Sequence, residues 1–324
     1  MRFKENSMKV VITDCNFASF AEEQQMCDRN GHQLIILQCK TPEEVIANTA
    51  DADALFVQYV PITDAVLANL KQCQVIVRYG IGLDNIDLAA AKKHNVPVCN
   101  VPDYGIDEVA DHASALTLTL LRQLTFFDNS IRQGKWPSVA PTPMLSCKGM
   151  MFTVAGAGRI GRATLERMRA FGFKLGAYDP YVSEKDLNDM GVEKLSLDDL
   201  FSKADVISLH LPLSKETHHL VNRDRLKSMK NHAILINTSR GGLIDTHALA
   251  AALDAGEIGH AGIDVFESEP MEAGHPLRTC KNALLTPHIA YYSAASIVRL
   301  QRFAAEDVER ALTGKPLRCQ YTAV

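Results

Sequence analysis

A glycine-rich segment in the middle of the chain carries the clearest chemical signal. It reads V-A-G-A-G-R-I-G, with glycines at 156, 158 and 161, between an apolar run and a stretch of helical character. Gly156 permits a tight turn, Gly158 lets backbone approach a pyrophosphate, and Gly161 lets helix and strand pack closely. The first helical amides, at Arg159 and Ile160, can then meet the phosphates. The pattern predicts a dinucleotide-binding turn.

Asp179 strengthens this prediction, since a glycine-rich turn by itself need not hold a ligand. It ends the next apolar run, 18 residues after Gly161, where a carboxylate accepts hydrogen bonds from the ribose hydroxyls of adenosine. A carboxylate at this place repels a 2′-phosphate, and neither Pro180 nor Tyr181 offers a positive charge instead. We therefore expect NAD rather than NADP, with Asp179 and Pro180 among the cofactor contacts.

Elements that alternate between strand and helix surround this turn on both sides. Nearly continuous Val, Ile and Leu runs are typical of strands covered on both faces, as in parallel sheets. Strands are expected at 9–13, 34–37, 54–57, 75–77, 96–99, 150–155, 175–178, 206–211, 233–237, 261–266 and 283–289. Helices are expected at 107–127, 159–171, 196–203 and 245–255, with Ser196 and Asp245 as N-caps, and a last helix should run to about Leu312 and stop at Gly314.

Two doubly wound parallel-sheet domains in series, an α/β fold, follow from this order. We place the domain boundaries at 1–105 with 292–324, and at 106–291. The last helix has no sheet of its own and is expected to pack on the first domain. Residues 128–149 contain Gly134, Trp136 and three prolines, so they should form an irregular excursion suited to serve as an arm onto a second subunit.

Bulk composition narrows the functional classes. With 324 residues, 47% hydrophobic and 22% charged, the chain can bury a large core. A formal net charge of -4 and the lack of a basic run disfavour nucleic acid as a partner. The eight cysteines form no C-x-x-C pair, so neither a zinc site nor a disulfide framework is expected. The start MRFKENS lacks a signal-peptide pattern and no run approaches the roughly 20 apolar residues of a membrane span, so we expect a cytoplasmic protein.

Several motifs, in order, resemble those of the D-isomer-specific 2-hydroxyacid dehydrogenase family over nearly the whole chain after Met8. They are G-I-G-L-D-N-I-D at 80–87, the glycine turn with Tyr178-Asp179-Pro180, His210-Leu211-Pro212-Leu213 with Thr217, Asn237-Thr238-Ser239-Arg240-Gly241, Asp264-Val265-Phe266 with Glu269-Pro270, and Thr286-Pro287-His288. The resemblance implies a flavodoxin-like substrate domain, a Rossmann NAD-binding domain and a homodimer. It also implies hydride transfer between NAD and a D-2-hydroxy acid or its 2-keto acid.

The family's catalytic residues fall here on Arg240, Glu269 and His288. All three lie at or just beyond the C-terminal ends of predicted strands, the edge where open parallel sheets bind ligands. Arg240 presents a fork of donors that can hold a carboxylate and polarise the adjoining carbonyl. His288 can donate a proton to the carbonyl oxygen in reduction and remove it in oxidation, and Glu269 can orient the imidazole and favour its protonated form. Taken singly, each could be structural; the ordered set favours catalysis.

Further contacts are implied by the same resemblance. The substrate carboxylate would be held at Gly80, Ile81 and Gly82, with Arg78 near it, although a structural ion pair explains Arg78 equally well. Tyr291 could wall the substrate pocket or simply pack in the core. His210, Leu211, Pro212, Thr217, Thr238, Ser239, Arg240, Asp264 and His288 would lie along the cofactor, with Asp264 accepting from the carboxamide.

Two other functions remain open within this resemblance. One is an NAD(H)-sensing interaction protein, because the sequence after His288, I-A-Y-Y-S, resembles the C-terminal-binding corepressors. The other is phosphoglycerate oxidation, disfavoured because the chain stops at Val324 without a regulatory domain, although shorter forms exist in the family. The family pattern is broken at Thr153, where a glycine is usual, and we expect that change to affect strand packing more than cofactor binding.

Overall fold

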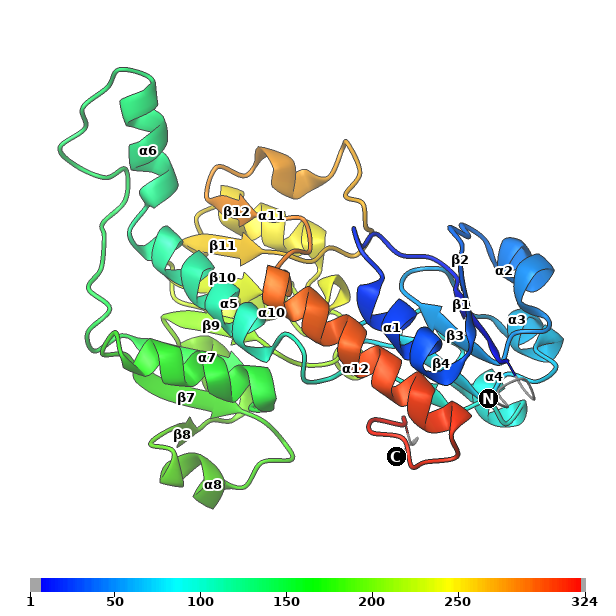
Figure 1. Ribbon diagram of the computed structural model, residues 1–324. Coiled ribbons are helices and arrows are strands. Elements are labelled where there is room, and N and C mark those ends of the chain that lie inside the picture. Colours follow the sequence, from blue (N-terminus) through cyan, green and yellow to red (C-terminus); the bar gives the residue numbers. More distant parts are fainter. Residues whose placement is uncertain (1–6, 322–324) are drawn as a thin grey trace. The chain divides into compact units, whose positions relative to one another are not determined.

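The computed structural model describes residues 7–321, which form two compact α/β units (Figure 1). The first unit joins the chain up to Gly105 with the chain from Tyr292 onwards, and the second runs from Ile106 to Tyr291. Residues 1–6, which belong to the segment predicted to carry no targeting signal, and residues 322–324 lie outside the described residues.

The first unit is built on a five-stranded parallel sheet in the order β2-β1-β3-β4-β5. The central strands have every or nearly every side chain buried, as their continuous apolar sequence predicts. The strands are β1 (Lys9–Ile12), β2 (Gln33–Ile36), β3 (Ala54–Val57), β4 (Val75–Arg78) and β5 (Val98–Cys99). The helices are α1 (Ala21–Asn30), α2 (Pro42–Thr49), α3 (Asp64–Asn69), α4 (Leu88–Lys93) and α12 (Ala294–Leu312).

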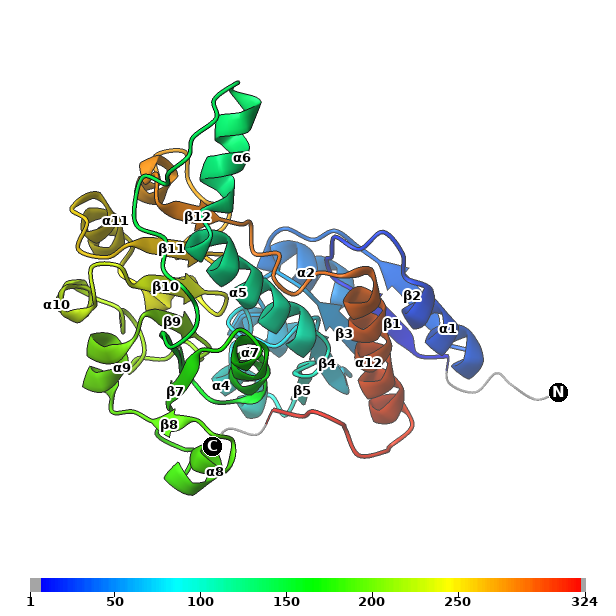
Figure 2. The same cartoon turned by 90° about the vertical axis from the view of Figure 1, so that its left-hand side faces the viewer.

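Helix α12 belongs to the first unit although it comes last in the chain, as the sequence predicted. It lies beside α1 in both ribbon views (Figures 1 and 2). Gln301 donates to the carbonyl of Ser19 at 2.7 Å, and Asn30 at the end of α1 donates to Glu309 at 2.7 Å. A capping box at Ser293 and Ser296 starts the helix, which satisfies two of its free amides.

The second unit contains a seven-stranded parallel sheet in the order β12-β11-β10-β9-β6-β7-β8. Its strands are β6 (Met151–Ala155), β7 (Lys174–Tyr178), β8 (Glu193–Lys194), β9 (Val206–Leu209), β10 (Ile234–Asn237), β11 (His260–Ile263) and β12 (Ala283–Leu285). Its helices are α5 (Ile106–Leu121), α6 (Leu124–Arg132), α7 (Arg159–Arg169), α8 (Glu184–Asp189), α9 (Leu197–Lys203), α10 (Arg223–Ser228) and α11 (Thr246–Asp254), with 3-10 turns η1 (Gly241–Leu243) and η2 (Pro276–Thr279). The strand order reverses between β6 and β9, the position at which such sheets bind ligands.

The predicted doubly wound α/β fold is confirmed, together with both predicted N-caps. Ser196 accepts from the amide of Asp199 at the start of α9, and Asp245 accepts from that of Ala248 at the start of α11. The strands predicted at 206–211, 261–266 and 283–289 end two to four residues earlier than expected. The apolar sequence continues into the loops that carry the candidate site, where Val265 is buried but Ile289 is 41% exposed.

The single helix predicted over 107–127 is wrong. It divides into α5 and α6 because Gln123 takes a left-handed backbone conformation, with φ of 49°. Helix α6 then continues to Arg132, so the irregular excursion expected from 128 begins only after that residue. The short elements α8, β8 and α10 were missed, since each is too brief to show a periodic pattern.

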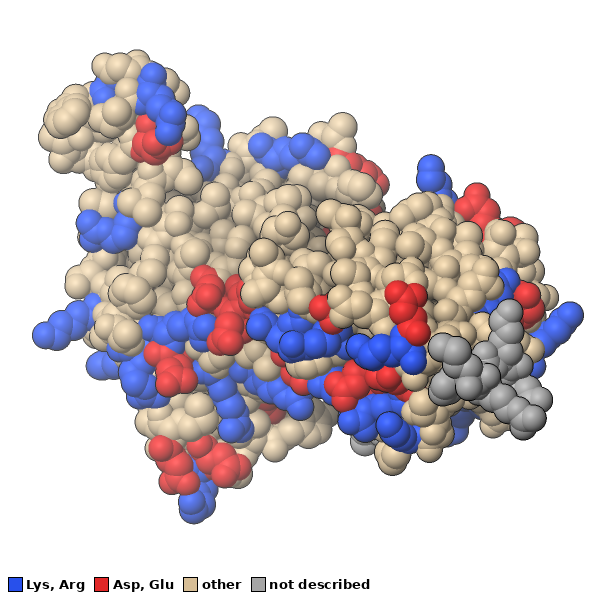
Figure 3. All heavy atoms as spheres, in the orientation of Figure 1, with Lys and Arg blue, Asp and Glu red and all other residues tan. Residues whose placement is uncertain are grey.

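Other global features accord with a folded domain protein. On the face shown in Figure 3, basic and acidic side chains are interspersed and do not separate into blocks of one sign. None of the helices within residues 7–321 is both long and apolar enough to cross a bilayer. All eight cysteines lie in the described part of the chain, and none forms a disulfide there.

Candidate active site

The glycine turn lies at the reversal point of the seven-stranded sheet, after β6. Gly156 has φ of 97°, and a Cβ added there would lie 2.6 Å from the carbonyl oxygen of His210, which follows β9. A Cβ added at Gly161 would lie 2.1 Å from the carbonyl oxygen of Gly156. Both positions therefore require glycine, one for its backbone conformation and both for close approach. A Cβ at Gly158, by contrast, would meet nothing within 4 Å, so the open side of the turn is at Gly158.

Asp179 lies beside this turn, and two backbone amides fix its carboxylate. One carboxylate oxygen accepts from the amide of Ala157 and the other from the amide of Tyr181, each at 2.8 Å. These two bonds fix the side chain beside the glycine turn, and each oxygen keeps a further lone pair for a hydroxyl donor. The geometry suits the predicted ribose contact.

His288 and Glu269 form the central pair of the candidate site. Nδ1 of His288 lies 2.6 Å from Oε2 of Glu269, and the amide of Phe266 donates to Oε1 of the same carboxylate at 2.9 Å. Burial raises the pKa of Glu269, but the hydrogen bond and positive charge of His288, the amide of Phe266 and the charge of Arg240 outweigh it, so the net pKa is below its usual range. The carboxylate therefore remains ionised. It contacts only Nδ1 of the imidazole, so Nε2 takes no part in this pair.

Arg240 approaches this pair from the end of β10. The carbonyl of Arg240 accepts from the side chain of Asn237 at 2.9 Å, which fixes the backbone after the strand. A Cβ at the next residue, Gly241, would lie 1.9 Å from the carbonyl carbon of Phe266, so the loops carrying Arg240 and Glu269 are in direct contact. The three residues predicted as catalytic thus gather at one edge of one sheet.

The backbone of His288 is held in a conformation that the sequence did not reveal. Its φ is 51°, which is rare for a residue with a side chain. The buried Asp264 maintains it: its carbonyl accepts from the amide of His288 at 2.7 Å, and its carboxylate accepts from the amides of Ile289 and Ala290 at 3.0 Å. Asp264 also accepts from the hydroxyl of Thr286. The family resemblance implied a contact between Asp264 and the cofactor, and this supporting role was missed.

The other residues predicted along the cofactor are arranged less uniformly. His210 and Leu211 pack against the glycine turn, and burial lowers the pKa of His210 to about 4, so this imidazole is neutral. The hydroxyl of Thr217 instead donates to the carbonyl of Pro212 at 2.7 Å and accepts from the amide of Ser214, which stabilises its own loop. Ser239 donates to the carbonyl of Leu209 at 3.0 Å.

Tyr291 packs edge-on to His288, with ring centroids 6.1 Å apart. It therefore lies beside the candidate acid. No group of three or more histidine, cysteine, aspartate or glutamate side chains able to hold a metal ion occurs within residues 7–321.

The predicted carboxylate-binding loop lies in the first unit, after β4. Gly80 has φ of 132°, and a Cβ there would lie 1.9 Å from Nη1 of Arg78, so the guanidinium covers the glycine. The carbonyl of Gly80 accepts from the amide of Val101 at 2.9 Å, and the carbonyl of Ile81 accepts from Asn100 at 2.6 Å. Gly82 follows, partly exposed. The loop is thus held on its carbonyl side.

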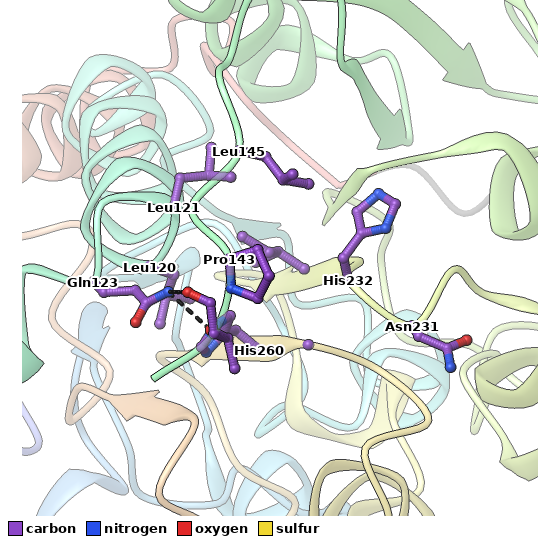
Figure 4. A pocket seen from close by; sticks show the side chains of 11 residues that line it. Leu120, Leu121, Gln123, Pro143, Leu145, Asn231, His232 and His260 are labelled. Carbon is purple, nitrogen blue, oxygen red and sulfur yellow. Dashed lines mark hydrogen bonds between the residues drawn. The ribbon is translucent and has the colours of Figure 1, made fainter. Parts of the chain in front are cut away.

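A separate cavity of about 360 Å³ opens at the opposite edge of the seven-stranded sheet (Figure 4). It is lined by the first residues of β10 and β11, Ile234 and His260, and by Gln123 and Pro143 from the segment around α6. Because the candidate catalytic residues follow the other ends of these strands, this cavity is not the candidate active site.

A dinucleotide fits the residues at the reversal point. Helix α7 has Gly158 as its N-cap and therefore no side-chain cap, so its first amides are suited to phosphate. The hydroxyl of Thr238, in the segment predicted to contact the cofactor, is buried without a hydrogen-bond partner in the described part of the chain. A doubly wound sheet with this turn and a histidine–glutamate pair at the same edge defines a class, the dinucleotide-dependent oxidoreductases.

Comparison with known proteins places the chain within that class. Residues 114–290 match the model of the NAD-binding domain of D-isomer-specific 2-hydroxyacid dehydrogenases. The chain therefore belongs to this family, and its second unit is an NAD-binding domain. The predicted family and cofactor are confirmed.

Individual relatives cover a range of substrates. D-3-phosphoglycerate dehydrogenases of Mycobacterium bovis and Mycobacterium tuberculosis are 40% identical over 276 residues, which is 84% of this chain. The chain spans about half, 52%, of the length of these relatives. The D-lactate dehydrogenase of Aquifex aeolicus, solved with NAD and lactic acid, is 31% identical with a TM-score of 0.85, covering 94% of this chain and 96% of its own. A glyoxylate reductase of Paecilomyes thermophila is 26% identical with a TM-score of 0.88, covering 98% of both chains.

Proposed function

We propose that this protein interconverts a D-2-hydroxy acid and its 2-keto acid, with NAD as hydride carrier and His288 as general acid and base. The observation that carries the proposal is the 2.6 Å contact between His288 Nδ1 and Glu269 Oε2 at the edge of the NAD-binding domain. The pair leaves Nε2 to deliver the proton, and the ionised carboxylate stabilises the imidazolium that must donate it.

The other residues have distinct tasks in this proposal. NADH, when bound, supplies the hydride. The guanidinium of Arg240 can hold a carboxylate and polarise the adjoining carbonyl. In the first unit, the backbone amides of the loop at 80–82 are assigned to the substrate carboxylate. Asp264 keeps His288 in its left-handed conformation through the amide bonds of the 288–290 turn. Tyr291, edge-on to the imidazole, borders the space for the substrate side chain.

A panel of 2-keto acids with NADH and NADPH tests the proposal. The panel includes pyruvate, glyoxylate, bulkier branched and aromatic 2-keto acids, and 3-phosphohydroxypyruvate. The last compound is included because the mycobacterial relatives are D-3-phosphoglycerate dehydrogenases. We expect NADH oxidation with at least one member. Absence of turnover across the panel, with NADH still bound, would instead favour an NAD(H)-sensing interaction protein.

Asp179 is proposed to set the preference for NAD over NADP. Its carboxylate is fixed by two backbone amides and would repel a 2′-phosphate. Replacing Asp179 with Ala should weaken NADH binding by about tenfold, one hydrogen-bonded contact's worth, and narrow the preference for NADH over NADPH. The dissociation constants of both nucleotides, from fluorescence titration, measure this. An unchanged ratio would refute the assignment.

We also propose that the protein is a homodimer joined through the segment 124–145. Leu124, Ile131, Trp136 and Val139 are 54%, 50%, 88% and 76% exposed, an unusual density of exposed apolar side chains. A two-fold contact would bury the segment of each copy against the other.

A further inference from the structure

A buried carboxylate in the first unit has no part in the chemistry described so far. Glu23 on α1 is fully buried, and both oxygens accept hydrogen bonds from neutral donors. The hydroxyl of Tyr79 donates to Oε1 at 2.7 Å, and the side-chain amide of Gln301 on α12 donates to Oε2 at 3.1 Å. Burial raises the pKa of Glu23, while these two donors oppose that shift.

The ring of Tyr79 is fixed as firmly as its hydroxyl. It stacks on Phe56 of β3, with centroids 5.2 Å apart and planes 8° from parallel, and meets Phe17 edge-on at 5.0 Å. The side chain is 2% exposed. Three contacts of different kinds therefore determine where residue 79 lies.

A buried carboxylate is an energetically unfavourable way to fill a protein core. Removing a carboxylate from water costs several kcal/mol, which apolar side chains of the same volume would avoid. What the carboxylate adds is direction, because a hydrogen bond fixes the position of the phenol oxygen and apolar packing does not. The presence of Glu23 is therefore better explained by a need to fix the position of Tyr79 than by stability.

The position of Tyr79 matters because it immediately precedes the loop predicted to bind the substrate carboxylate. Its amide donates to the carbonyl of Val57 at 2.8 Å, and the carbonyls of Gly80 and Ile81 are held by Val101 and Asn100. Any rotation of residue 79 would turn the peptide groups that follow it. Tyr79 thus lies at the start of the loop, with both its backbone and its side chain fixed.

We propose that Glu23 is a positioning residue for substrate binding, which acts through the hydroxyl of Tyr79 to fix the orientation of the backbone at 80–82. The inference rests on the proposed function, since it assigns this loop to the carboxylate of a 2-keto acid. Through Gln301, the same carboxylate also ties α12 to the base of the loop.

Two conservative substitutions test this in the whole chain of 324 residues. Tyr79→Phe removes the hydroxyl but keeps the stacked ring, and Glu23→Gln keeps the shape but removes the charge. Each should raise KM for the best 2-keto acid roughly 5- to 20-fold, about 1 to 2 kcal/mol of substrate binding, because the loop amides would be held less firmly toward the carboxylate. We expect kcat within about twofold of wild type and an unchanged dissociation constant for NADH. Glu22→Gln, on the same helix but partly exposed, is the matched control and should leave KM unchanged.

The double variant decides whether Glu23 acts through Tyr79. If it does, Glu23→Gln has no further effect on KM once Tyr79 is Phe, whereas independent effects would multiply. Multiplying effects, or single variants with the KM of wild type, would overturn the proposal. So would a loss of NADH affinity and melting temperature together with the rise in KM, since that pattern marks a general loss of packing.

Hydrogen exchange separates failure of this inference from failure of the proposed function. Both variants should speed amide exchange in a peptide covering 80–87 several-fold, with little change in peptides from the second unit. This readout needs no substrate. Faster exchange in an enzyme that reduces no 2-keto acid would refute the proposed function alone, while unchanged exchange would refute the role of Glu23.

Discussion

At the scale of single residues, the candidate site is an imidazole held by two kinds of support. Glu269 supplies charge to one ring nitrogen of His288, and Asp264 supplies hydrogen bonds to the backbone beneath it. The first support places a negative charge beside the imidazole, and the second fixes the backbone that carries it. The two functions can therefore be separated by substitution.

Removal of the imidazole tests the acid. His288→Ala should lower turnover by about 100-fold or more, the usual contribution of a positioned general acid, and leave NADH affinity nearly unchanged. His288→Asn is the better second variant, because asparagine tolerates the left-handed backbone found here. Steady-state rates and NADH titration measure both. If either variant keeps wild-type turnover, His288 is not the acid.

Removal of the carboxylate of Glu269 tests whether this residue favours the protonated imidazole of His288. The pKa of Glu269 is lowered, so its carboxylate is ionised at neutral pH. The contribution of this carboxylate to the stability of the fold is present above the usual carboxyl pKa. It is lost as the pH falls through the lowered pKa. Glu269→Gln removes the negative charge that lies beside the imidazole of His288. The pH at which reduction activity declines should therefore move down by about one unit. A profile of kcat/KM against pH gives the answer, and a profile that moves upward would contradict the assignment.

At the scale of elements, the glycine turn joins strand β6 to helix α7, and Gly161 of the helix lies close to the carbonyl of Gly156 in the turn. Gly161→Ala would place a Cβ 2.1 Å from the carbonyl of Gly156, which cannot be relieved by a side-chain movement. We expect NADH affinity to fall at least tenfold, with a lower melting temperature. Gly274→Ala, where a Cβ would meet nothing within 4 Å, is the control and should alter neither quantity.

Elements also show how far the sequence could be interpreted. Apolar runs, N-caps at Ser196 and Asp245, and the three glycines indicated most strands, two helix starts and the cofactor turn, because each depends on local chemistry. The break at Gln123 and the φ of His288 could not be predicted, since both are left-handed positions occupied by residues other than glycine. Tertiary hydrogen bonds stabilise them, as those from Asp264 do for the turn at His288. The anchor of Tyr79 on Glu23 joins residues 56 positions apart and left no local trace.

At the scale of the whole molecule, the exposed apolar segment around α6 predicts self-association. Light scattering should give twice the mass of the chain for wild type. Trp136→Ala combined with Val139→Asp should shift the protein to monomer at micromolar concentration, by removing one large apolar contact and adding a charge to the interface. Tyr181→Ala removes a side chain that is 96% exposed elsewhere on the second unit and should leave the mass unchanged. A monomeric wild type would refute the dimer.

The interleaved course of the chain also has a consequence for biosynthesis. Residues 106–291 form one uninterrupted unit, whereas the first unit needs α12, whose last residue is Leu312. On the ribosome, the NAD-binding domain can complete its fold while the N-terminal sheet still waits for the helix that covers α1. The first part of the chain to be synthesised is thus the last to mature, and nascent chains that stall before residue 294 should expose it to proteases and chaperones.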